Sequence, residues 1–174
     1  ITSYWPRPGA VQLPAPPVLV GHSMGGMIAQ ACAMHHPHQV DRLVLAATAP
    51  VNSARNNDLF GTWVQLFGTL DRATWFRNLF YWVLTTKFFD NAATADALVK
   101  LAAGYPYQQT TASFRNQVAA IAAFDATAVL PAIRARTLVL AGAQDLLFPL
   151  ASSAAFAKAI PRATFAAVDE SAHS

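Results

Sequence analysis

The segment Gly21-His22-Ser23-Met24-Gly25 matches the pattern G-x-S-x-G, in which the serine can act as a nucleophile. This chemistry requires the serine to sit on a sharp turn between a strand and a helix, so that its hydroxyl projects above a sheet. Because such a turn crowds the backbone, we expect positions 21 and 25 to require glycine and Gly26 to let the helix pack closely on the sheet. We expect the Met24 amide, at the helix N-terminus, to donate a hydrogen bond to a developing oxyanion. The pattern predicts Ser23 as the nucleophile of an acyl transfer.

A glycine-rich turn of this kind has two other interpretations. A serine that precedes a helix often caps the helix with its side chain and has no catalytic role. A phosphate-binding loop requires G-x-x-x-x-G-K-[ST], and no lysine follows these glycines. The apolar run Val18–Val20 before the turn and the helical pattern after it favour the catalytic interpretation.

A nucleophilic serine needs a general base and an acidic residue that orients this base, and several carboxylates are candidates for the acid. We expect the acid just past the carboxyl end of a parallel strand, at the edge of the sheet where the serine turn also opens. Asp145 follows an apolar run in this way, whereas Asp125 precedes a predicted helix and is better interpreted as its cap. Asp169 and Glu170 follow the last predicted strand and remain alternatives. The pattern favours Asp145.

Histidine is the usual general base for a serine nucleophile, and the chain offers several. His35, His36 and His38 lie at a predicted helix end, where histidines commonly interact with exposed carbonyl groups. His22 lies next to the serine and cannot readily turn back onto it. His173 follows the last predicted strand through a short loop, and the pattern predicts it as the base.

These candidates lie at the ends of predicted strands. Apolar runs predict strands at Val18–Val20, Leu43–Ala47, Thr137–Ala141 and Thr164–Val168. Helical periodicity predicts helices near Met24–His36, Asp58–Leu70, Arg72–Thr85, Ala93–Ala103, Thr111–Ala123 and Ala151–Ala159. Because Val18–Val20 is wholly apolar, we expect it to be buried on both faces. The alternation of strands and helices predicts an α/β fold with a mostly parallel sheet.

The middle of the chain differs in character from the two ends. Residues 50–124 predict only helices, so we expect them to form a helical cap on a core made of residues 1–49 and 125–174. Ten of the nineteen aromatic residues fall between Phe60 and Phe89, within this predicted cap. They have two interpretations: the cap's own core, or the lining of an apolar pocket above Ser23 that selects hydrophobic acyl or alcohol groups.

The segments Gly21–Gln30, His36-Pro37 and Arg42–Leu45 resemble the nucleophile elbow and following strand of the α/β-hydrolase superfamily. The resemblance is to the cap-bearing serine esterase and lactonase-like branch, and it continues through Ala122–Asp125, Leu130–Ile133 and Thr137–Gly142 to Asp145 and His173. It implies a triad in the chain order serine, acid, histidine, which matches Ser23, Asp145 and His173. It also implies hydrolysis of a small or medium hydrophobic carboxylic ester or lactone, with no metal or organic cofactor.

The sequence departs from this family upstream of the elbow. In the family, a second oxyanion donor comes from a loop before the elbow strand. Few residues precede Ser23 here, and Pro14-Ala15-Pro16-Pro17 makes further strands among them improbable. The chain also begins with Ile1. We therefore expect an N-terminally truncated part of a longer hydrolase that lacks the earlier strands and is poorly active and poorly soluble by itself.

Other activities on the same fold remain open. Hydrolysis of a C–C bond or of a thioester uses much the same triad. The serine argues against the dehalogenase and epoxide-hydrolase branches, whose nucleophile is aspartate. Two alternatives are not enzymes. One is a ligand receptor that retains the triad without using it for catalysis, and the other is an inactive fragment.

Composition excludes several other classes of protein. Hydrophobic residues make up 54% of the 174 residues and charged residues 12%, which excludes intrinsic disorder. A net charge of +3 is too small to predict a nucleic-acid partner. The one cysteine, Cys32, excludes a disulfide framework and a cysteine-based zinc site. No segment predicts a membrane span or a signal peptide, so we expect a cytoplasmic protein; nothing in the sequence predicts an oligomeric state.

Overall fold

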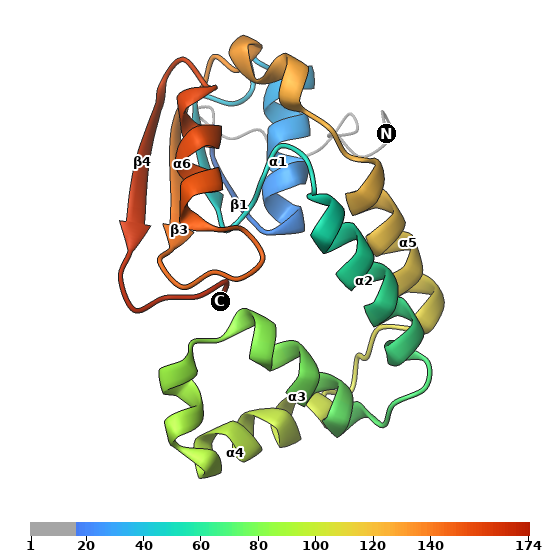
Figure 1. Ribbon diagram of the computed structural model, residues 1–174. Coiled ribbons are helices and arrows are strands. Elements are labelled where there is room, and N and C mark those ends of the chain that lie inside the picture. Colours follow the sequence, from blue (N-terminus) through green and yellow to red (C-terminus); the bar gives the residue numbers. More distant parts are fainter. Residues whose placement is uncertain (1–16) are drawn as a thin grey trace.

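A parallel sheet forms the centre of the fold in the computed structural model, which describes residues 17–174 (Figure 1). The four strands follow the order β1-β2-β3-β4. They are β1 (Val18–His22), β2 (Arg42–Ala46), β3 (Arg136–Gly142) and β4 (Ala163–Val168). All neighbouring strands are parallel, so their carboxyl ends meet at one edge of the sheet. The predicted α/β fold with a mostly parallel sheet is confirmed.

Two helices connect neighbouring strands and pack on the sheet. Helix α1 (Met24–His35) joins β1 to β2, and α6 (Leu150–Lys158) joins β3 to β4. One apolar core runs between these helices and the strands, with Leu43, Leu45 and Val139 from the sheet among its most buried side chains. This packing holds the carboxyl ends of the strands at fixed positions relative to one another.

The first strand is less buried than its sequence predicts. Val18 is 51% exposed and Val20 is 65% exposed, so the expectation that this run is buried on both faces was wrong. Within residues 17–174, β1 has a strand partner on one side only. Val44 and Leu138, which pair in register next to Val20, are only half-buried.

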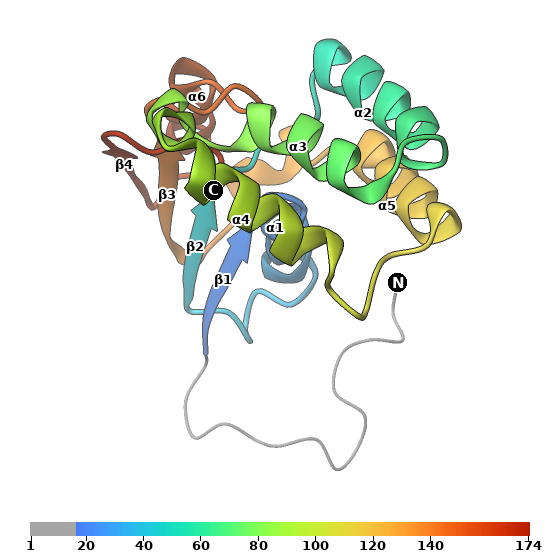
Figure 2. The ribbon, with the colours of Figure 1, turned by 90° about the horizontal axis from the view of Figure 1, so that it is seen from below.

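Between β2 and β3 the described chain is mainly helical, and its part from Arg72 to Ala103 lies beyond the carboxyl ends of the strands (Figures 1 and 2). We call residues 54–123 the helical insertion. Its elements are α2 (Ala54–Phe67), α3 (Arg72–Val83), the 3-10 helix η1 (Thr86–Asp90), α4 (Ala92–Ala103) and α5 (Thr111–Ala123). Helix α2 packs on α5 and α3 packs on α4, and a second 3-10 helix, η2 (Thr127–Ala132), leads back to β3. The division of the chain at residues 50 and 124 stays a prediction.

Polar caps set where the helices of the insertion begin. The Ser53 side chain accepts a hydrogen bond from the Asn56 amide at 3.1 Å, so α2 begins at Ala54, four residues before its predicted start at Asp58. Asp71 caps α3 in the same way, accepting from the Thr74 amide at 3.0 Å. None of the described helices is both long enough and apolar enough to cross a bilayer.

Aromatic rings hold the helices of the insertion together. Phe60, Trp63 and Trp75 are buried, and the rings of Trp63 and Trp75 meet edge to face at 6.0 Å. The same apolar cluster includes Met27 of α1, and Leu147 and Phe148 of the loop after β3. The aromatic residues therefore form both the core of the insertion and its apolar contact with the sheet layer.

Candidate active site

Ser23 lies on the turn between β1 and α1, with φ 52° and ψ −123°. Positive φ is costly for a residue with a side chain and persists only where the surroundings impose it. The Ser23 amide donates to the Ala46 carbonyl at 2.9 Å, and the Thr48 hydroxyl donates to the Ser23 carbonyl at 2.7 Å. The Ser23 side chain makes no capping hydrogen bond to α1, so the helix-cap interpretation was wrong.

The glycines of the turn have different roles. A Cβ atom at position 21 would collide with the backbone of Gly25 and Gly26, and one at position 26 would lie 2.5–2.7 Å from the Thr48 side chain. Gly21 and Gly26 therefore allow the close approaches that the sequence predicts. A Cβ atom at position 25 would meet nothing within 4 Å, so the expectation that Gly25 must be small was wrong. Gly25 contributes to the crowding of the turn through its backbone, which leaves no room for a Cβ atom at position 21.

The structure brings Ser23, His173 and Asp145 together at the carboxyl edge of the sheet. The Nε2 atom of His173 lies 3.0 Å from the Oγ atom of Ser23, and its Nδ1 atom lies 3.0 Å from the Oδ2 atom of Asp145. A serine hydroxyl, an imidazole and a carboxylate in this order can transfer a proton away from the serine as it attacks a carbonyl carbon.

The Asp145 carboxylate is completely buried and held at both oxygens. Its Oδ1 atom accepts hydrogen bonds from the Leu147 and Phe148 amides at 2.8 and 2.9 Å, while Oδ2 faces His173. The two amides and the imidazole together fix the orientation of this carboxylate. The Phe148 ring also packs 5.6 Å from the imidazole. Asp145 can therefore orient His173 without rotating.

Hydrogen bonds to its backbone hold the loop that carries His173, including one from the Ser174 amide to the Val83 carbonyl at 3.0 Å. His22 lies next to the nucleophile, and its Nε2 atom is 2.7 Å from the His173 carbonyl oxygen, to which it can donate. The Gln144 amide donates to the Ser171 carbonyl at 2.8 Å. Gly142 has no room for a Cβ atom, which would collide with the Ala172 carbonyl. Sequence reasoning missed the role of His22, because no local pattern links it to a residue 151 positions away.

The other carboxylates considered from the sequence have different partners. Asp125 accepts from the Thr127 amide at 2.8 Å, and hydrogen bonds from the amide and side chain of Thr127 lower its pKa. The N-cap residue of η2 is Ala126, so the cap interpretation of Asp125 is not confirmed. Glu170 pairs with Lys87 of η1 at 3.2 Å on the surface. The histidines at positions 35, 36 and 38 lie at or just after the end of α1. The structure brings none of these residues to Ser23.

The Met24 amide is available to an oxyanion. The Gly26 and Met27 amides donate to the Ser23 carbonyl, whereas the Met24 amide has no acceptor within residues 17–174. An unpaired amide at a helix N-terminus, adjacent to the nucleophile, suits a negative charge that develops on the substrate oxygen. The loop that the family resemblance implies for a second donor would lie in residues before β1, outside the described part of the chain.

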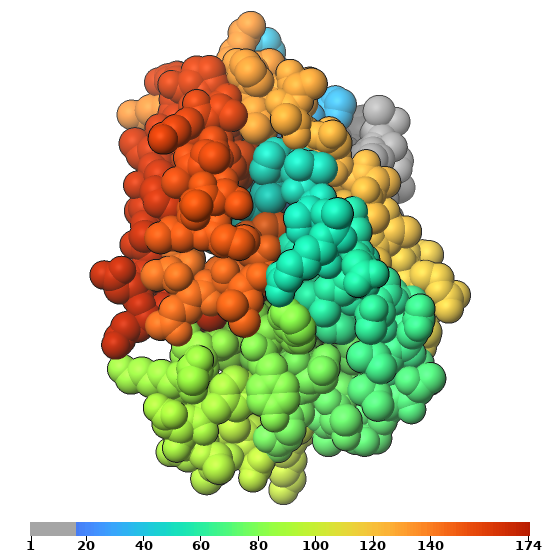
Figure 3. All heavy atoms as spheres, viewed as in Figure 1, coloured from blue at the N-terminus to red at the C-terminus, as the bar shows by residue number. Residues whose placement is uncertain are grey.

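The insertion touches the loop that carries Asp145. Asn56 is buried, and its Nδ2 atom donates to the Leu147 carbonyl at 2.7 Å. The Arg55 guanidinium donates to the Leu146 carbonyl at 2.9 Å and lies 5.2 Å above the Trp82 ring. In the space-filling view the start of α2 lies against the segment after β3 (Figure 3). Hydrogen bonds from α2 therefore fix the position of this loop.

A cavity of about 460 Å³ lies between the insertion and the Asp145 loop. Its walls on the insertion are formed by α3, η1 and the residues between them, including Tyr81, Leu84 and Phe89. The opposite wall is the segment from Ala143 to Leu146. Neither Ser23 nor His173 lines this cavity, so the predicted apolar pocket above Ser23 stays a prediction.

Comparisons with known proteins agree with this fold. The family model described as alpha/beta hydrolase fold matches residues 12–174. The pimeloyl-[acyl-carrier protein] methyl ester esterase of Aromatoleum aromaticum is 30% identical over 93% of this chain, which covers 68% of that protein. The 2-hydroxymuconate semialdehyde hydrolase of a Pseudomonas species is 32% identical over 83% of this chain, which covers 51% of that protein.

Solved structures show the same fold. The enol-lactonase from Burkholderia xenovorans superposes with a TM-score of 0.77 at 22% identity, over 90% of this chain and 58% of that one. The chain thus spans roughly half to two thirds of the length of the proteins that it matches.

Proposed function

The chain belongs to the alpha/beta hydrolase fold family, and on this premise we propose that it is a serine hydrolase that cleaves small or medium hydrophobic carboxylic esters or lactones through an acyl-enzyme. The observation that carries this proposal is the unbroken contact from Ser23 Oγ through the imidazole of His173 to the Asp145 carboxylate.

The proposed reaction begins with attack of Ser23 Oγ on the carbonyl carbon of the ester. His173 takes the serine proton on Nε2, and Asp145 holds the Nδ1–H group and stabilises the imidazolium that forms. His173 then gives the proton to the departing alcohol oxygen, which leaves an acyl group on Ser23. Water, deprotonated by the same imidazole, releases the acid and restores the hydroxyl of Ser23.

The Met24 amide would stabilise the tetrahedral intermediate. Each donor directed at the oxyanion is typically worth about 2.7–4 kcal/mol of activation free energy. The fixed position of the amide supports this role, because Ser23 and the first turn of α1 are held by Ala46 and Thr48.

The substrate class rests on the lining of the cavity and on the relatives. Tyr81, Leu84 and Phe89 present apolar surface beside the Asp145 loop, which favours substrates with a hydrophobic acyl or alcohol group. The relatives include a methyl ester esterase, whose name favours an ester carbonyl. The similarity to a 2-hydroxymuconate semialdehyde hydrolase keeps hydrolysis of a C–C bond as the second candidate.

The test combines covalent labelling with ester hydrolysis. We expect a fluorophosphonate to modify Ser23, identified by mass spectrometry, and p-nitrophenyl acetate and butyrate to give a burst of p-nitrophenol. Ser23→Ala should abolish both, with a loss of kcat of about 10⁶-fold where turnover is measurable. The matched control is Ser152→Ala, because Ser152 is an exposed serine on α6. Labelling at another residue, or hydrolysis that survives Ser23→Ala, would overturn the proposal.

A further inference from the structure

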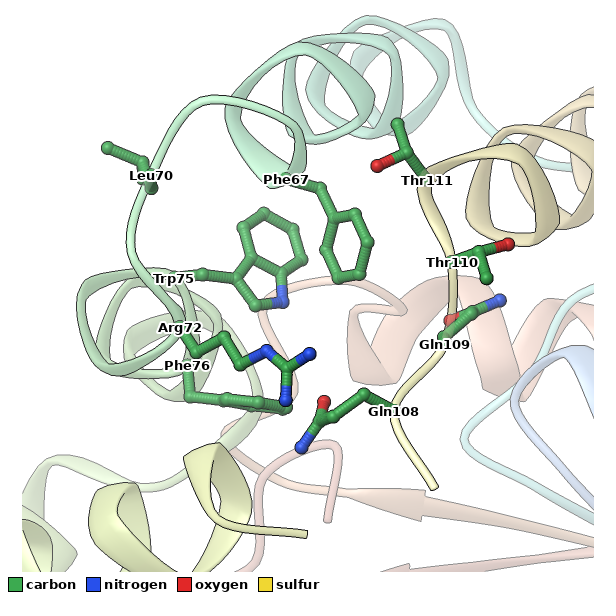
Figure 4. A pocket seen from close by; sticks show the side chains of 9 residues that line it. All are labelled: Phe67, Leu70, Arg72, Trp75, Phe76, Gln108, Gln109, Thr110 and Thr111. Carbon is green, nitrogen blue, oxygen red and sulfur yellow. The ribbon is translucent and has the colours of Figure 1, made fainter. Parts of the chain in front are cut away.

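A second cavity, of about 440 Å³, lies within the insertion (Figure 4). It is bounded by the end of α2, the start of α3 and the segment that leads into α5. None of its lining residues belongs to the Ser23, His173 and Asp145 constellation. Its volume is in the range of cavities that hold small molecules.

Aromatic side chains form much of the wall of this cavity. Phe67, Trp75 and Phe76 line it, together with Leu70. The rings of Phe67 and Trp75 meet edge to face at 5.2 Å, and Phe114 packs 5.5 Å from Trp75 behind them. The aromatic walls are therefore held in place by the core of the insertion and suit an apolar body.

The cavity also contains an unpaired cation. The guanidinium of Arg72 forms no hydrogen bond or ion pair within the described part of the chain. The adjacent carboxylate of Asp71 is engaged elsewhere, because it accepts from the amide and the hydroxyl of Thr74 at 3.0 and 2.6 Å. These hydrogen bonds hold the pKa of Asp71 below its usual value. Arg72 is thus free to pair with an anion.

A buried donor lies beside this cation. Trp75 is only 4% exposed, and its indole N–H group has no acceptor among residues 17–174. Figure 4 shows the indole nitrogen directed into the cavity, with the Arg72 guanidinium between it and the Gln108 amide. The amide nitrogen of Gln108 already donates to the Ala102 carbonyl at 2.7 Å. The side-chain donors available to a ligand therefore include the guanidinium and the indole N–H.

We propose that this cavity binds a monocarboxylate with an aromatic or other apolar body, at a site separate from Ser23. A guanidinium pairs with a carboxylate through two parallel hydrogen bonds, and the indole N–H supplies a third donor. One cation with no second positive charge among the lining residues balances a single negative charge, which favours a carboxylate over a phosphate dianion. The aromatic walls take the apolar body. This inference does not depend on the proposed hydrolysis.

Isothermal titration calorimetry on the full chain tests the site with three probes: 3-phenylpropanoate, its uncharged amide and inorganic phosphate. We expect saturable binding of 3-phenylpropanoate. The amide should bind at least tenfold more weakly, because it cannot form the charge-assisted hydrogen bonds that the carboxylate forms with Arg72. Arg72→Gln should weaken binding of the carboxylate about tenfold for the same reason. Trp75→Phe, which keeps an aromatic ring but removes the N–H donor, should weaken it about threefold.

Matched controls separate the site from general effects of substitution. Trp82→Phe changes a ring in the same aromatic cluster that does not line the cavity and contacts the ring of Trp63, and Arg134→Gln removes an exposed cation from the sheet layer. Both variants should bind 3-phenylpropanoate like the parent chain. Three results would overturn the proposal: no binding, equal affinity for the acid and its amide, or unchanged affinity in Arg72→Gln. Phosphate binding as tight as that of 3-phenylpropanoate would also contradict it, because the apolar body would then contribute nothing.

Discussion

The sheet layer and the helical insertion are held together by different kinds of contact. In the sheet layer, two buried polar side chains make several hydrogen bonds each: Gln30 donates to the Gly26 and Ala49 carbonyls, and Asp145 accepts from two amides and faces His173. In the insertion, the largest buried side chains are the aromatic rings of Phe60, Trp63 and Trp75, and α5 buries no residue completely.

This difference separates two tasks: the sheet layer positions the candidate catalytic atoms, and the insertion shapes the cavities. Hydrogen bonds are directional and fix atoms to within tenths of an ångström, which the contact between Ser23 and His173 requires. Aromatic packing fills volume with less demand on direction, so it can shape a cavity without determining the geometry of a reaction. Asn56 and Arg55 are the exceptions, because they hydrogen-bond from α2 to the loop that carries Asp145.

The largest expected effect is on kcat and comes from a substitution at Asp145 in the sheet layer. Asp145→Asn should lower kcat for p-nitrophenyl esters about 10⁴-fold, since an amide favours the wrong tautomer of His173 while occupying the same space. The thermal midpoint should change little by comparison. Asp125→Asn serves as the control and should retain full activity, because the Asp125 carboxylate is bonded to Thr127 and not to His173. Equal losses in both variants would contradict the assignment of Asp145.

Removing an aromatic ring from the insertion should lower stability but leave the reactivity of Ser23 nearly unchanged. Trp63 is 5% exposed and packs against Phe60, Trp75 and Trp82, so Trp63→Ala should lower the free energy of unfolding by about 3–5 kcal/mol. Chemical denaturation measures this effect, and Trp63→Phe should recover most of it. Labelling of Ser23 by a fluorophosphonate should continue at nearly the parent rate in the folded fraction. A labelling rate as low as that of Asp145→Asn would show that the two tasks are not separable.

Asn56 tests the junction between the two regions. Asn56→Ala leaves the buried carbonyl of Leu147 without its donor, which should cost about 1–3 kcal/mol of stability. Because the Leu147 amide orients Asp145, kcat should fall as well. Denaturation and ester kinetics on the same sample measure both effects. Arg55→Gln, which removes an exposed contact with the neighbouring carbonyl, should have a smaller effect on both; the reverse order would contradict this account of the junction.

The smallest expected effect is at the cap of α2. Ser53→Ala removes the acceptor for the Asn56 amide and should cost about 1 kcal/mol, seen as a lower thermal midpoint with unchanged kcat. Ser53→Asn supplies another capping oxygen and should restore the midpoint. Failure of the asparagine to restore it would mean that the Ser53 side chain acts through a contact other than capping.

Local patterns were enough to predict the main elements and where the candidate site residues would meet. The short apolar run, the glycines and the helix after them predict the turn at Ser23, because its geometry depends on adjacent residues. Asp145 and His173 could be named because both follow strands, and the carboxyl ends of parallel strands lie at one edge.

Contacts between distant residues could not be predicted. The hydrogen bonds from His22 to the His173 carbonyl and from Asn56 to the Leu147 carbonyl join residues 151 and 91 positions apart. The exposure of Val18 and Val20 on β1 was not predicted, because an apolar sequence indicates that a strand can be buried but not which elements cover it. The start of α2 was missed because its first turn, Ala54-Arg55-Asn56-Asn57, carries no apolar periodicity and depends on Ser53.

The separation of 150 residues between Ser23 and His173 also bears on how the molecule folds. Bringing these residues together requires closure of nearly the whole described chain, which is slow compared with forming local helices. His173 follows β4, an edge strand within residues 17–174 on which no residue is completely buried. We expect the Ser23 turn to form with the first strand–helix unit and the imidazole to arrive only when β4 joins the sheet. Transient detachment of β4 would then move His173 away from Ser23 and stop the reaction, while the rest of the fold stays intact.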